Sequence, residues 1–447
     1  MTTVANSLRG LCGGALHLPG DPGYDTARMP WNVTVDQRPA AVAYPADAAE
    51  VAAVVRAAAV AGLRVAAQGT GHSAGPLGPL DDVVLLRTSA MTGVTVTGRT
   101  ARAEAGALWV DVVEQAAPHG LAALHGSSPD VGVVGYTLGG GIGWYARAHG
   151  LQCNAVTAVE LVTADGTLLR VDAASEPDLF WALRGGGGNF GVVTAVEFDL
   201  IPVSRVYAGM LAWDWREAGR VLPAWLDWAA TAPAEVTTAL RLLQVPAIPQ
   251  LPAVLHDRQV VAIDGAVLGP AGPDLLAPLR ALKPFLDTFD DAPAASLIRL
   301  HLDPEGPTPS VSRSALLGDL PAAAVDALLA VAGPGSGSSL LVPAELRQLG
   351  GALGRPAPGG GALSALNGSF ALFSAGIAAT PAMGEAAVAD AARVAAAMAP
   401  WTTGAYLNFA EERVEASAAF GASALRRLRS IRAAVDPSGL FVANHSI

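Results

Sequence analysis

Three glycine-rich segments in the first half of the chain have the residue types that bind an extended ligand. They read QGTGHS at residues 68–73, GVVGYTLGGGIG at 132–143 and RGGGGNFG at 184–191. Glycine is required where φ is positive or where a Cβ would collide with a ligand, and successive free N–H groups form a nest for an anion. Each segment alone could equally serve tight turns. Three of them in one region favour a ligand that carries a pyrophosphate.

Other common sites fit the sequence poorly. Gly69 and Gly71 have no third glycine at the spacing of a Rossmann motif, and no acidic residue follows a matching strand about twenty positions on. The two cysteines, Cys12 and Cys153, are too few and too far apart for a disulfide framework or a cysteine zinc site. No metal is therefore expected.

The composition excludes several classes of protein. Of 447 residues, 51% are hydrophobic and only 15% are charged, which is typical of a folded chain with large cores. The net charge of −11 argues against nucleic acid or an anionic membrane as a partner. Residues 1–10 lack the apolar core of a secretion signal. The uncharged stretch 356–384 is broken by prolines and glycines, so we expect a buried strand pair there and a soluble, cytoplasmic protein.

The elements that must position these loops alternate between helix and strand from about residue 40 to 200. Asp47 and Glu50 have the spacing of a helix N-terminal capping box, and that helix should end near Gly62. The patterns predict strands at 64–67, 82–86, 156–163, 168–171 and 192–200, and helices at 108–117 and 176–183.

After Pro202 the sequence changes in character, and we place a domain boundary near residue 203. Four tryptophans should lie in the core on a helix: Trp213, Trp215, Trp225 and Trp228. The patterns predict strands at 237–243, 259–267, 364–377 and 404–409, and helices at 322–332, 385–398 and 422–435. The fold class is therefore expected to be α+β.

Together these motifs carry a family resemblance. The three glycine-rich segments, SPDVG at 128–132, VTADG at 162–166, PDLFWAL before Arg184, YLNF at 406–409 and the ending LFVANHSI resemble the berberine-bridge-enzyme-like branch of the vanillyl-alcohol-oxidase flavoprotein superfamily. The matches are dense at 28–200 and 404–447. The chain looks closest to a subgroup with one covalent flavin link, which includes the hydroxynicotine oxidases and some polyketide-tailoring flavoenzymes.

The resemblance implies an architecture and a cofactor. It implies an FAD-binding domain at 1–203 with a PCMH-type core at about 36–203, a substrate domain at 204–409 with an antiparallel sheet backed by helices, and a segment at 410–447 that returns to the first domain. It also implies FAD, attached covalently to His72 through the flavin 8α-methyl carbon. Some relatives make a second link to a cysteine at the position of Ser128, and a serine hydroxyl is no comparable nucleophile, so one link is expected. Cys153 should be a small buried residue.

The cofactor-binding residues that the resemblance implies come from these motifs. The pyrophosphate should lie on the backbone N–H groups of residues 68–73, because the acidic chain offers few cations. The full set is Gln68, Gly69, Thr70, Gly71, His72, Ser73, Ser128, Val131, Gly132, Tyr136, Thr137, Gly139, Gly140, Gly141, Gly143, Val193, Asn408 and Asn444.

The resemblance places the catalytic residues on the segment with Tyr406 and Asn408, and adds Tyr136 as a hydrogen-bonding residue near the flavin. In many relatives a tyrosine at the position of Phe409 takes up the substrate proton, and phenylalanine cannot do so. Another base would come from Tyr136, Asp264, Glu345 or Glu411; alternatively the substrate needs no strong base, or the flavin serves as an oxygenating agent or scaffold.

The expected function is that of an FAD-dependent oxidase or oxygenating flavoenzyme. It would act on a small organic molecule, such as a secondary metabolite, by hydride transfer to flavin N5 and reoxidation by O2. Val131 matches a position associated with oxygen access to the flavin. The alternative is a non-redox cyclase or a degenerate flavin-binding protein that keeps the fold.

Overall fold

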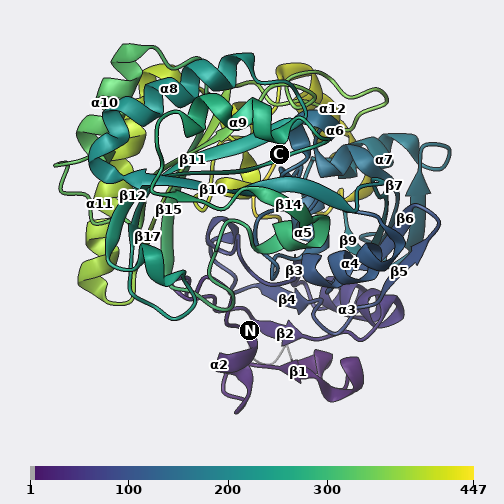
Figure 1. The fold of residues 1–447 in the computed structure, drawn as a ribbon. Helices are drawn as coiled ribbons and strands as arrows, with labels where there is room; N and C mark the ends of the chain where they lie inside the picture. Colours follow the sequence, from purple (N-terminus) through teal and green to yellow (C-terminus); the bar gives the residue numbers. More distant parts are fainter. Residues whose placement is uncertain (1–5) are drawn as a thin grey trace.

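The protein has an α+β fold built around three β-sheets (Figure 1). A computed structural model describes residues 6–447, so the first five residues of the expected 1–203 domain lie outside it. Two short 3₁₀ helices precede the first strand, and the helix α2 (Tyr24–Ala27) lies between the first and second strands.

The first sheet has the strand order β1–β2–β4–β3, and β2, β4 and β3 run parallel. Its helix α3 (Ala48–Val60) begins as predicted, because the side chain of Asp47 accepts a hydrogen bond from the N–H of Glu50 at 2.9 Å. The strands are β1 (Leu16–His17), β2 (Ala41–Ala43), β3 (Arg64–Gln68) and β4 (Val83–Arg87).

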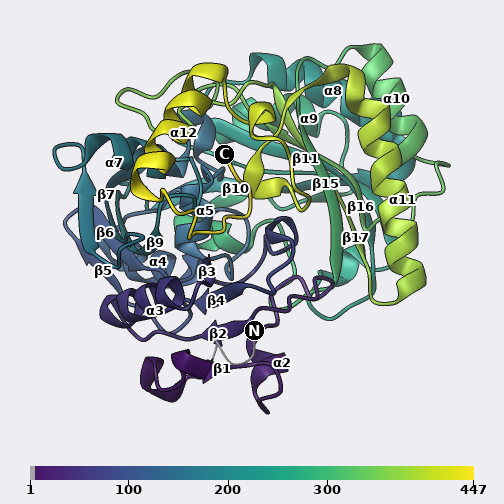
Figure 2. The same ribbon diagram turned by 180° about the vertical axis from the view of Figure 1, so that it is seen from behind.

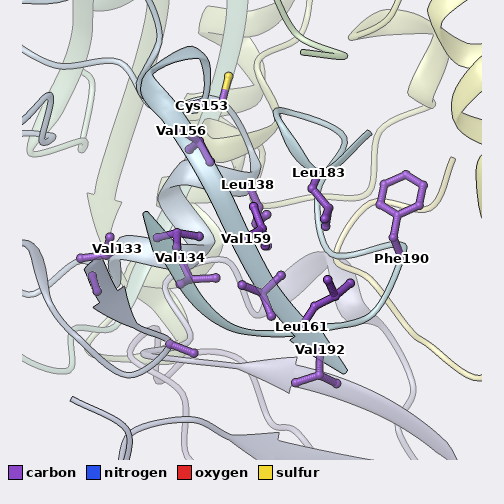
Figure 3. Packing of buried hydrophobic residues seen from close by; sticks show 14 of the residues in the cluster. Val133, Val134, Leu138, Cys153, Val156, Val159, Leu161, Leu183, Phe190 and Val192 are labelled. Atoms are coloured by element: carbon purple, nitrogen blue, oxygen red, sulfur yellow. The ribbon is translucent and has the colours of Figure 1, made fainter. Parts of the chain in front are cut away.

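The second sheet is antiparallel, in the order β5–β6–β9–β7–β8. Figure 3 shows its core, where Val133, Val134 and Leu138 lie in one hydrophobic cluster with Val159 and Leu161. Its elements are β5 (Val94–Thr97), β6 (Thr100–Glu104), α4 (Trp109–Ala116), α5 (Val133–Leu138), α6 (Ala146–His149), β7 (Val156–Val162), β8 (Leu168–Asp172), α7 (Pro177–Leu183) and β9 (Val192–Asp199).

The third sheet has nine strands, all antiparallel, and helices cover one of its faces (Figures 1 and 2). The strands are β10 (Arg205–Asp214), β11 (Val236–Val245), β12 (Arg258–Val267), β13 (Leu286–Asp287), β14 (Asp290–Pro293), β15 (Ser310–Leu317), β16 (Val342–Gln348), β17 (Phe370–Ile377) and β18 (Thr402–Gly404). The helices are α8 (Ala218–Thr231), α9 (Gly272–Arg280), α10 (Ala322–Ala332) and α11 (Pro381–Met398).

The C-terminal segment returns to the first sheet. Helix α12 (Ala422–Val435) packs near α7, and the chain beyond it pairs with β3 through a parallel bridge between Val65 and Phe441 (Figure 2). The N–H of Val65 donates to Leu440 at 2.9 Å, and the N–H of Val442 donates to Val65 at 2.8 Å.

Several local predictions were wrong. The strand expected at 404–409 is absent, because β18 ends at Gly404 and Leu407–Phe409 forms a 3₁₀ turn. The stretch 356–384 contains one strand, β17, and the start of a helix at Pro381 instead of a strand pair. Trp213 lies on strand β10 and Trp215 on a 3₁₀ turn, while only Trp225 and Trp228 lie on a helix. The predicted helices at 322–332 and 422–435 are confirmed to the residue.

Candidate functional site

The loop after β3 presents a run of free backbone donors. From Gly69 to Ala74 no N–H group donates to an acceptor within residues 6–447. Gly71 adopts φ = +89°, and a Cβ there would lie 2.3 Å from the amide nitrogen of Gln68. Successive N–H groups of this kind form an anion-binding concavity. The loop can therefore bind a pyrophosphate with backbone donors alone.

His72 lies in this loop, where three other residues contact its ring. Its ring stacks on Trp31 with the centroids 4.1 Å apart and the planes 18° from parallel. Nδ1 lies 2.7 Å from the hydroxyl of Thr70, and Nε2 lies 3.5 Å from a carboxylate oxygen of Asp130. The side chain of Asn444 donates to the carbonyl of Ser73 and so ties the C-terminal segment to the same loop.

Asp130 accepts several hydrogen bonds in addition to its contact with His72. Its oxygens accept hydrogen bonds from the hydroxyl of Ser128 at 2.9 Å, the indole N–H of Trp31 at 2.7 Å and the N–H of Gly306 at 2.7 Å. Burial alone would raise the pKa of Asp130, but the contacts with His72, Gly306 and Trp31 outweigh it and hold that pKa well below its usual range. The carboxylate is therefore ionised.

The glycines at 139–143 in the second glycine-rich segment pack closely against other parts of the chain. A Cβ on Gly139 would lie 1.8 Å from the side chain of Asn408, and one on Gly143 would lie 1.9 Å from the carbonyl of His125. The N–H of Gly141 donates to the hydroxyl of Tyr406 at 2.8 Å. These glycines therefore allow close packing of protein on protein.

The start of the same segment is more open. A Cβ on Gly132 would meet only the methyl group of Thr70, at 3.9 Å, and one on Gly135 would meet no atom of residues 6–447 within 4 Å. Space at this end of the segment is therefore available to a ligand held by the loop at 69–74.

Buried polar atoms without a partner gather around these loops. The amides of Gln68 and Gln152 and the hydroxyl of Thr137 have no hydrogen-bond partner within residues 6–447. Buried polar groups are almost always satisfied in native proteins. A ligand rich in nitrogen and oxygen, such as FAD, fits this set together with the free N–H groups of the loop at 69–74.

The third sheet offers a charged face opposite its helix-covered face. Alternation along β11, β12 and β16 puts apolar side chains such as Leu240, Ile263 and Leu346 under the helices. Arg241 and Glu345 are direct partners across β11 and β16, and Ala239 is paired with both Asp264 and Arg347. The charged side chains that share the other face are Arg241, Asp264, Glu345 and Arg347.

His301 joins these charges into one buried network. Its Nδ1 lies 2.8 Å from Asp264 and its Nε2 lies 3.0 Å from Glu345, while Arg241 contacts Asp264 and Arg347 contacts Glu345. Burial and Arg241 would lower the pKa of His301, but the carboxylates of Asp264 and Glu345 raise it to about 9. Burial would raise the pKa of Glu345, but Arg347 and His301 hold it below its usual range.

This network reaches the first half of the chain through Arg347. The guanidinium lies 5.0 Å above the ring of Phe409 and donates to the hydroxyl of Ser127 at 3.2 Å. The ring of Trp144, just after the second glycine-rich segment, lies 5.5 Å from His301. A small cavity between the sheet and this segment is lined by Ser127, Trp144 and Arg347 among others.

The remaining candidate bases lie in unlike surroundings. Burial raises the pKa of Tyr136, whose hydroxyl donates to Leu124 at 3.0 Å, and it also raises the pKa of Tyr406. Burial raises the pKa of Glu411 to about 7, and this carboxyl lies 3.4 Å from the amide of Asn32. The two phenols are therefore poor bases near neutral pH, while Glu411 titrates there.

Other predicted site residues have mainly packing roles. Val193 and Cys153 are buried in the hydrophobic core, and the prediction for Cys153 is confirmed. Val131 is half-buried, and its carbonyl accepts a hydrogen bond from Trp109. Asn408 donates to the carbonyl of Tyr136 at 2.8 Å, so it holds the backbone just before the glycines at 139–141.

Sequence reasoning missed five residues that the structure brings to the site. Asp264 and Glu345 were candidates, but their partners in the network and the neighbours of His72 were not. The pattern Glu-Leu-Arg at 345–347 alternates charge with an apolar residue and could have indicated a strand with one charged face. The missed residues are Trp31, Asp130, Arg241, His301 and Arg347.

Comparison with known families identifies the class. A family model described as an FAD binding domain matches residues 39–172, and one described as berberine and berberine like matches residues 405–447. Together with the fold, these matches show an FAD binding domain and a berberine-like C-terminal part in this chain. The resemblance, the PCMH-type fold and FAD as the cofactor, all expected from the sequence, are thereby confirmed.

Curated relatives match part of the chain. The chain is 36% identical over 203 residues to (R)-6-hydroxynicotine oxidase of Paenarthrobacter nicotinovorans, covering 45% of this chain and 44% of that protein. It is 34% identical over 234 residues to glucooligosaccharide oxidase of Sarocladium strictum, covering 51% of this chain and 47% of that protein. The matches thus span about half the length of these relatives.

Solved structures match over nearly the whole chain. Physcomitrella patens BBE-like 1 has a TM-score of 0.84 at 22% identity, with 99% of this chain and 98% of that chain covered. Glucooligosaccharide oxidase from Acremonium strictum, described with a 6-S-cysteinyl, 8α-N1-histidyl FAD, has a TM-score of 0.78 at 24% identity, with 97% of each chain covered. At these identities the structures establish the shared fold.

Metal sites and membrane spans are both absent from residues 6–447. This part of the chain contains no group of three or more His, Cys, Asp or Glu side chains arranged to hold a metal ion. Within the same range, every helix is too short or too polar to cross a membrane.

Proposed function

We propose that the protein is an FAD-linked oxidoreductase that oxidises a small polar organic molecule and passes the electrons to O2. The observation that carries this proposal is that residues 127–130 link two surfaces, because Asp130 lies 3.5 Å from His72 and Ser127 accepts a hydrogen bond from Arg347. One is the loop at 69–74 with its free N–H groups and His72, and the other is the charged face of the third sheet at Phe409. The first suits a flavin dinucleotide, and the second suits a polar substrate beside it.

The cofactor would be attached to His72. The imidazole lies in the loop with the free donors, and no thiol is placed for a second attachment within residues 6–447, because Ser128 takes that position and Cys153 is buried in the core. Bound FAD supplies the acceptor for a substrate hydride. The chain supplies the backbone nest, and Asn408 and Tyr406 hold the segment around Gly141 in place.

Substrate binding and proton handling would fall to the charged face. Arg347 has donors close to Ser127 and Phe409, where it can bind a polar group of the substrate. Arg347 contacts Glu345, and Glu345 in turn lies 3.0 Å from Nε2 of His301. Phe409 itself cannot take a proton, so Glu411, whose pKa burial raises to about 7, would serve where the substrate needs a base.

A test of the cofactor uses the purified chain and its His72→Ala variant. Wild-type protein should be yellow and should keep its colour on the polypeptide after acid precipitation, while His72→Ala should release its FAD. A substrate screen that follows hydrogen peroxide, with anaerobic bleaching of the flavin and its return in air, tests the redox activity. A flavin that no substrate bleaches would favour a non-redox protein that keeps the fold.

A test of the substrate site uses Arg347→Met. We expect KM to rise at least about tenfold, as befits the loss of one charge-assisted hydrogen bond, with bound FAD unchanged. Arg313→Met is the matched control, because Arg313 lies on the same sheet but pairs with Glu412 at the surface. Equal effects of the two substitutions would argue against the charged face as the substrate site.

A further inference from the structure

We propose that Asp130 is a positioning residue that prepares His72 for attachment to FAD by fixing the tautomer of its imidazole, and that Ser128 orients Asp130. This inference rests on the proposed attachment at His72. It concerns how the bond is made, which is separate from whether FAD binds.

The two ring nitrogens of His72 have different neighbours, and these neighbours determine which nitrogen carries the hydrogen. Nε2 is buried, has no hydrogen-bond partner within residues 6–447, and has Asp130 as its charged neighbour at 3.5 Å. Nδ1 faces the hydroxyl of Thr70 at 2.7 Å, which can donate to it. An anionic neighbour favours the tautomer with hydrogen on Nε2, so the lone pair that attacks is on Nδ1, where the flavin carbon would replace the hydrogen bond from Thr70.

Trp31 fixes both partners of this pair at once. Its ring stacks on the imidazole at 4.1 Å, and its indole N–H donates to the carboxylate of Asp130 at 2.7 Å. The carboxylate therefore has a set distance and direction from the ring. A short shift of Asp130 would break a bond to Trp31 as well as the contact to His72.

Ser128 completes the arrangement. Its hydroxyl donates at 2.9 Å to Oδ1 of Asp130, the same oxygen that faces His72, while Gly306 and Trp31 both donate to Oδ2. The serine stands where the resemblance puts a second flavin-linking cysteine in other proteins. Here it supports the single histidine link instead.

The attachment step balances with dioxygen as the oxidant. One C–H bond of the flavin 8α-methyl group breaks and one bond forms between that carbon and Nδ1 of His72. One proton leaves the methyl carbon and the other leaves Nε2 of His72. The two electrons pass to O2, which with the two protons becomes hydrogen peroxide.

The test follows covalent attachment in full-length apoprotein from a riboflavin-limited host. Wild type, Asp130→Asn and Asp130→Ala are incubated with FAD in air, and flavin is measured before and after acid precipitation. We expect both variants to bind FAD but to attach it at least about tenfold more slowly. Formate, a small carboxylate, should restore attachment in Asp130→Ala in a concentration-dependent way.

The matched control is Asp303→Asn. Asp303 accepts a hydrogen bond from Ser127 in the same segment, and the structure places no bond between it and His72. This variant should attach FAD at the wild-type rate. Attachment at the wild-type rate in Asp130→Asn, or a loss in Asp130→Ala that formate leaves unchanged, would overturn the role of Asp130. Release of all colour from the wild type would instead overturn the proposed link to His72 itself.

Discussion

The ring of Phe409 lies between two groups that make its replacement informative. The guanidinium of Arg347 is 5.0 Å from the ring centroid, and the ring of Tyr406 meets it edge-on at 5.0 Å. Phe409 offers a π-face to a cation and no proton acceptor. Any proton that leaves the substrate must therefore go elsewhere.

Phe409→Tyr tests whether this chain is an alcohol oxidase that has lost its base. A tyrosine hydroxyl has an ordinary pKa of about 10 and would add a polar group to a pocket that does not satisfy it. We expect turnover of alcohol substrates, followed by peroxide release, to stay unchanged or to fall. A clear gain in alcohol oxidation would show that a phenol at this position completes the site.

Glu411 should make stability depend on pH. Burial raises its pKa in the folded protein to about 7, above the 4.5 of the free side chain, so the folded state holds the proton more tightly. Stability from this group is fully present below pH 4.5 and is lost as the pH rises towards 7. Glu411→Gln should therefore raise the free energy of unfolding by about 1–3 kcal/mol at pH 8.

The measurement is chemical denaturation of wild type and Glu411→Gln at pH 8 and pH 4.5. The difference between the two proteins should be largest at pH 8 and close to zero at pH 4.5. A constant difference at both values would mean that the carboxyl is not protonated in the fold.

At the scale of elements, the third sheet has one apolar face and one face with buried charged side chains. Leu240, Ile263 and Leu346 lie under the helices, while the face with Arg241 and Glu345 carries buried charge. A buried ion network is costly unless every member is paired. The network should therefore respond far more strongly to the loss of one charge than a surface pair does.

Glu345→Gln tests this difference. It leaves Arg347 and His301 buried without their shared carboxylate, so we expect a loss of about 3–5 kcal/mol in the free energy of unfolding. The control is Glu412→Gln, because Glu412 is exposed and pairs with the partly exposed Arg313, and its cost should stay below about 1 kcal/mol. Similar costs from urea denaturation would mean that the buried pairs are not coupled.

Sequence patterns were most successful where a local signal was strong. The capping residues Asp47 and Glu50 predicted the start of α3, and a long apolar period predicted α10. The face with Arg241, Glu345 and His301 could not be predicted, because it depends on the register of strands about a hundred residues apart. The 3₁₀ turn at Leu407–Phe409 was mistaken for a strand, since three residues carry too little periodicity.

At the scale of the whole molecule, the C-terminal segment closes over the loop of His72. Asn444 bonds to Ser73, and Phe441 pairs with Val65 at the start of the strand that leads to the loop. These contacts support the division that we propose, with an FAD-binding part at 1–203 completed by 410–447 and a substrate part at 204–409 between them.

Asn444→Ala tests the contribution of the C-terminal segment. Loss of one side-chain hydrogen bond to the carbonyl of Ser73 should weaken FAD binding by about 1 kcal/mol, or about fivefold. The dissociation constant is measured in a His72→Ala background, where the cofactor stays exchangeable. A thermal transition equal to that of His72→Ala alone would show that folding is intact, and an unchanged affinity would remove Asn444 from the cofactor site.

The bridge between Val65 and Phe441 also bears on how the protein is made. β3 is synthesised early, yet the segment around Phe441 that pairs with it emerges from the ribosome only after the substrate part has been translated. Pairing across so long a stretch of chain is slow, and it must wait for that part to be synthesised. The nest at 69–74 is therefore completed last, so FAD should load onto the finished polypeptide, and no nascent chain should carry the cofactor.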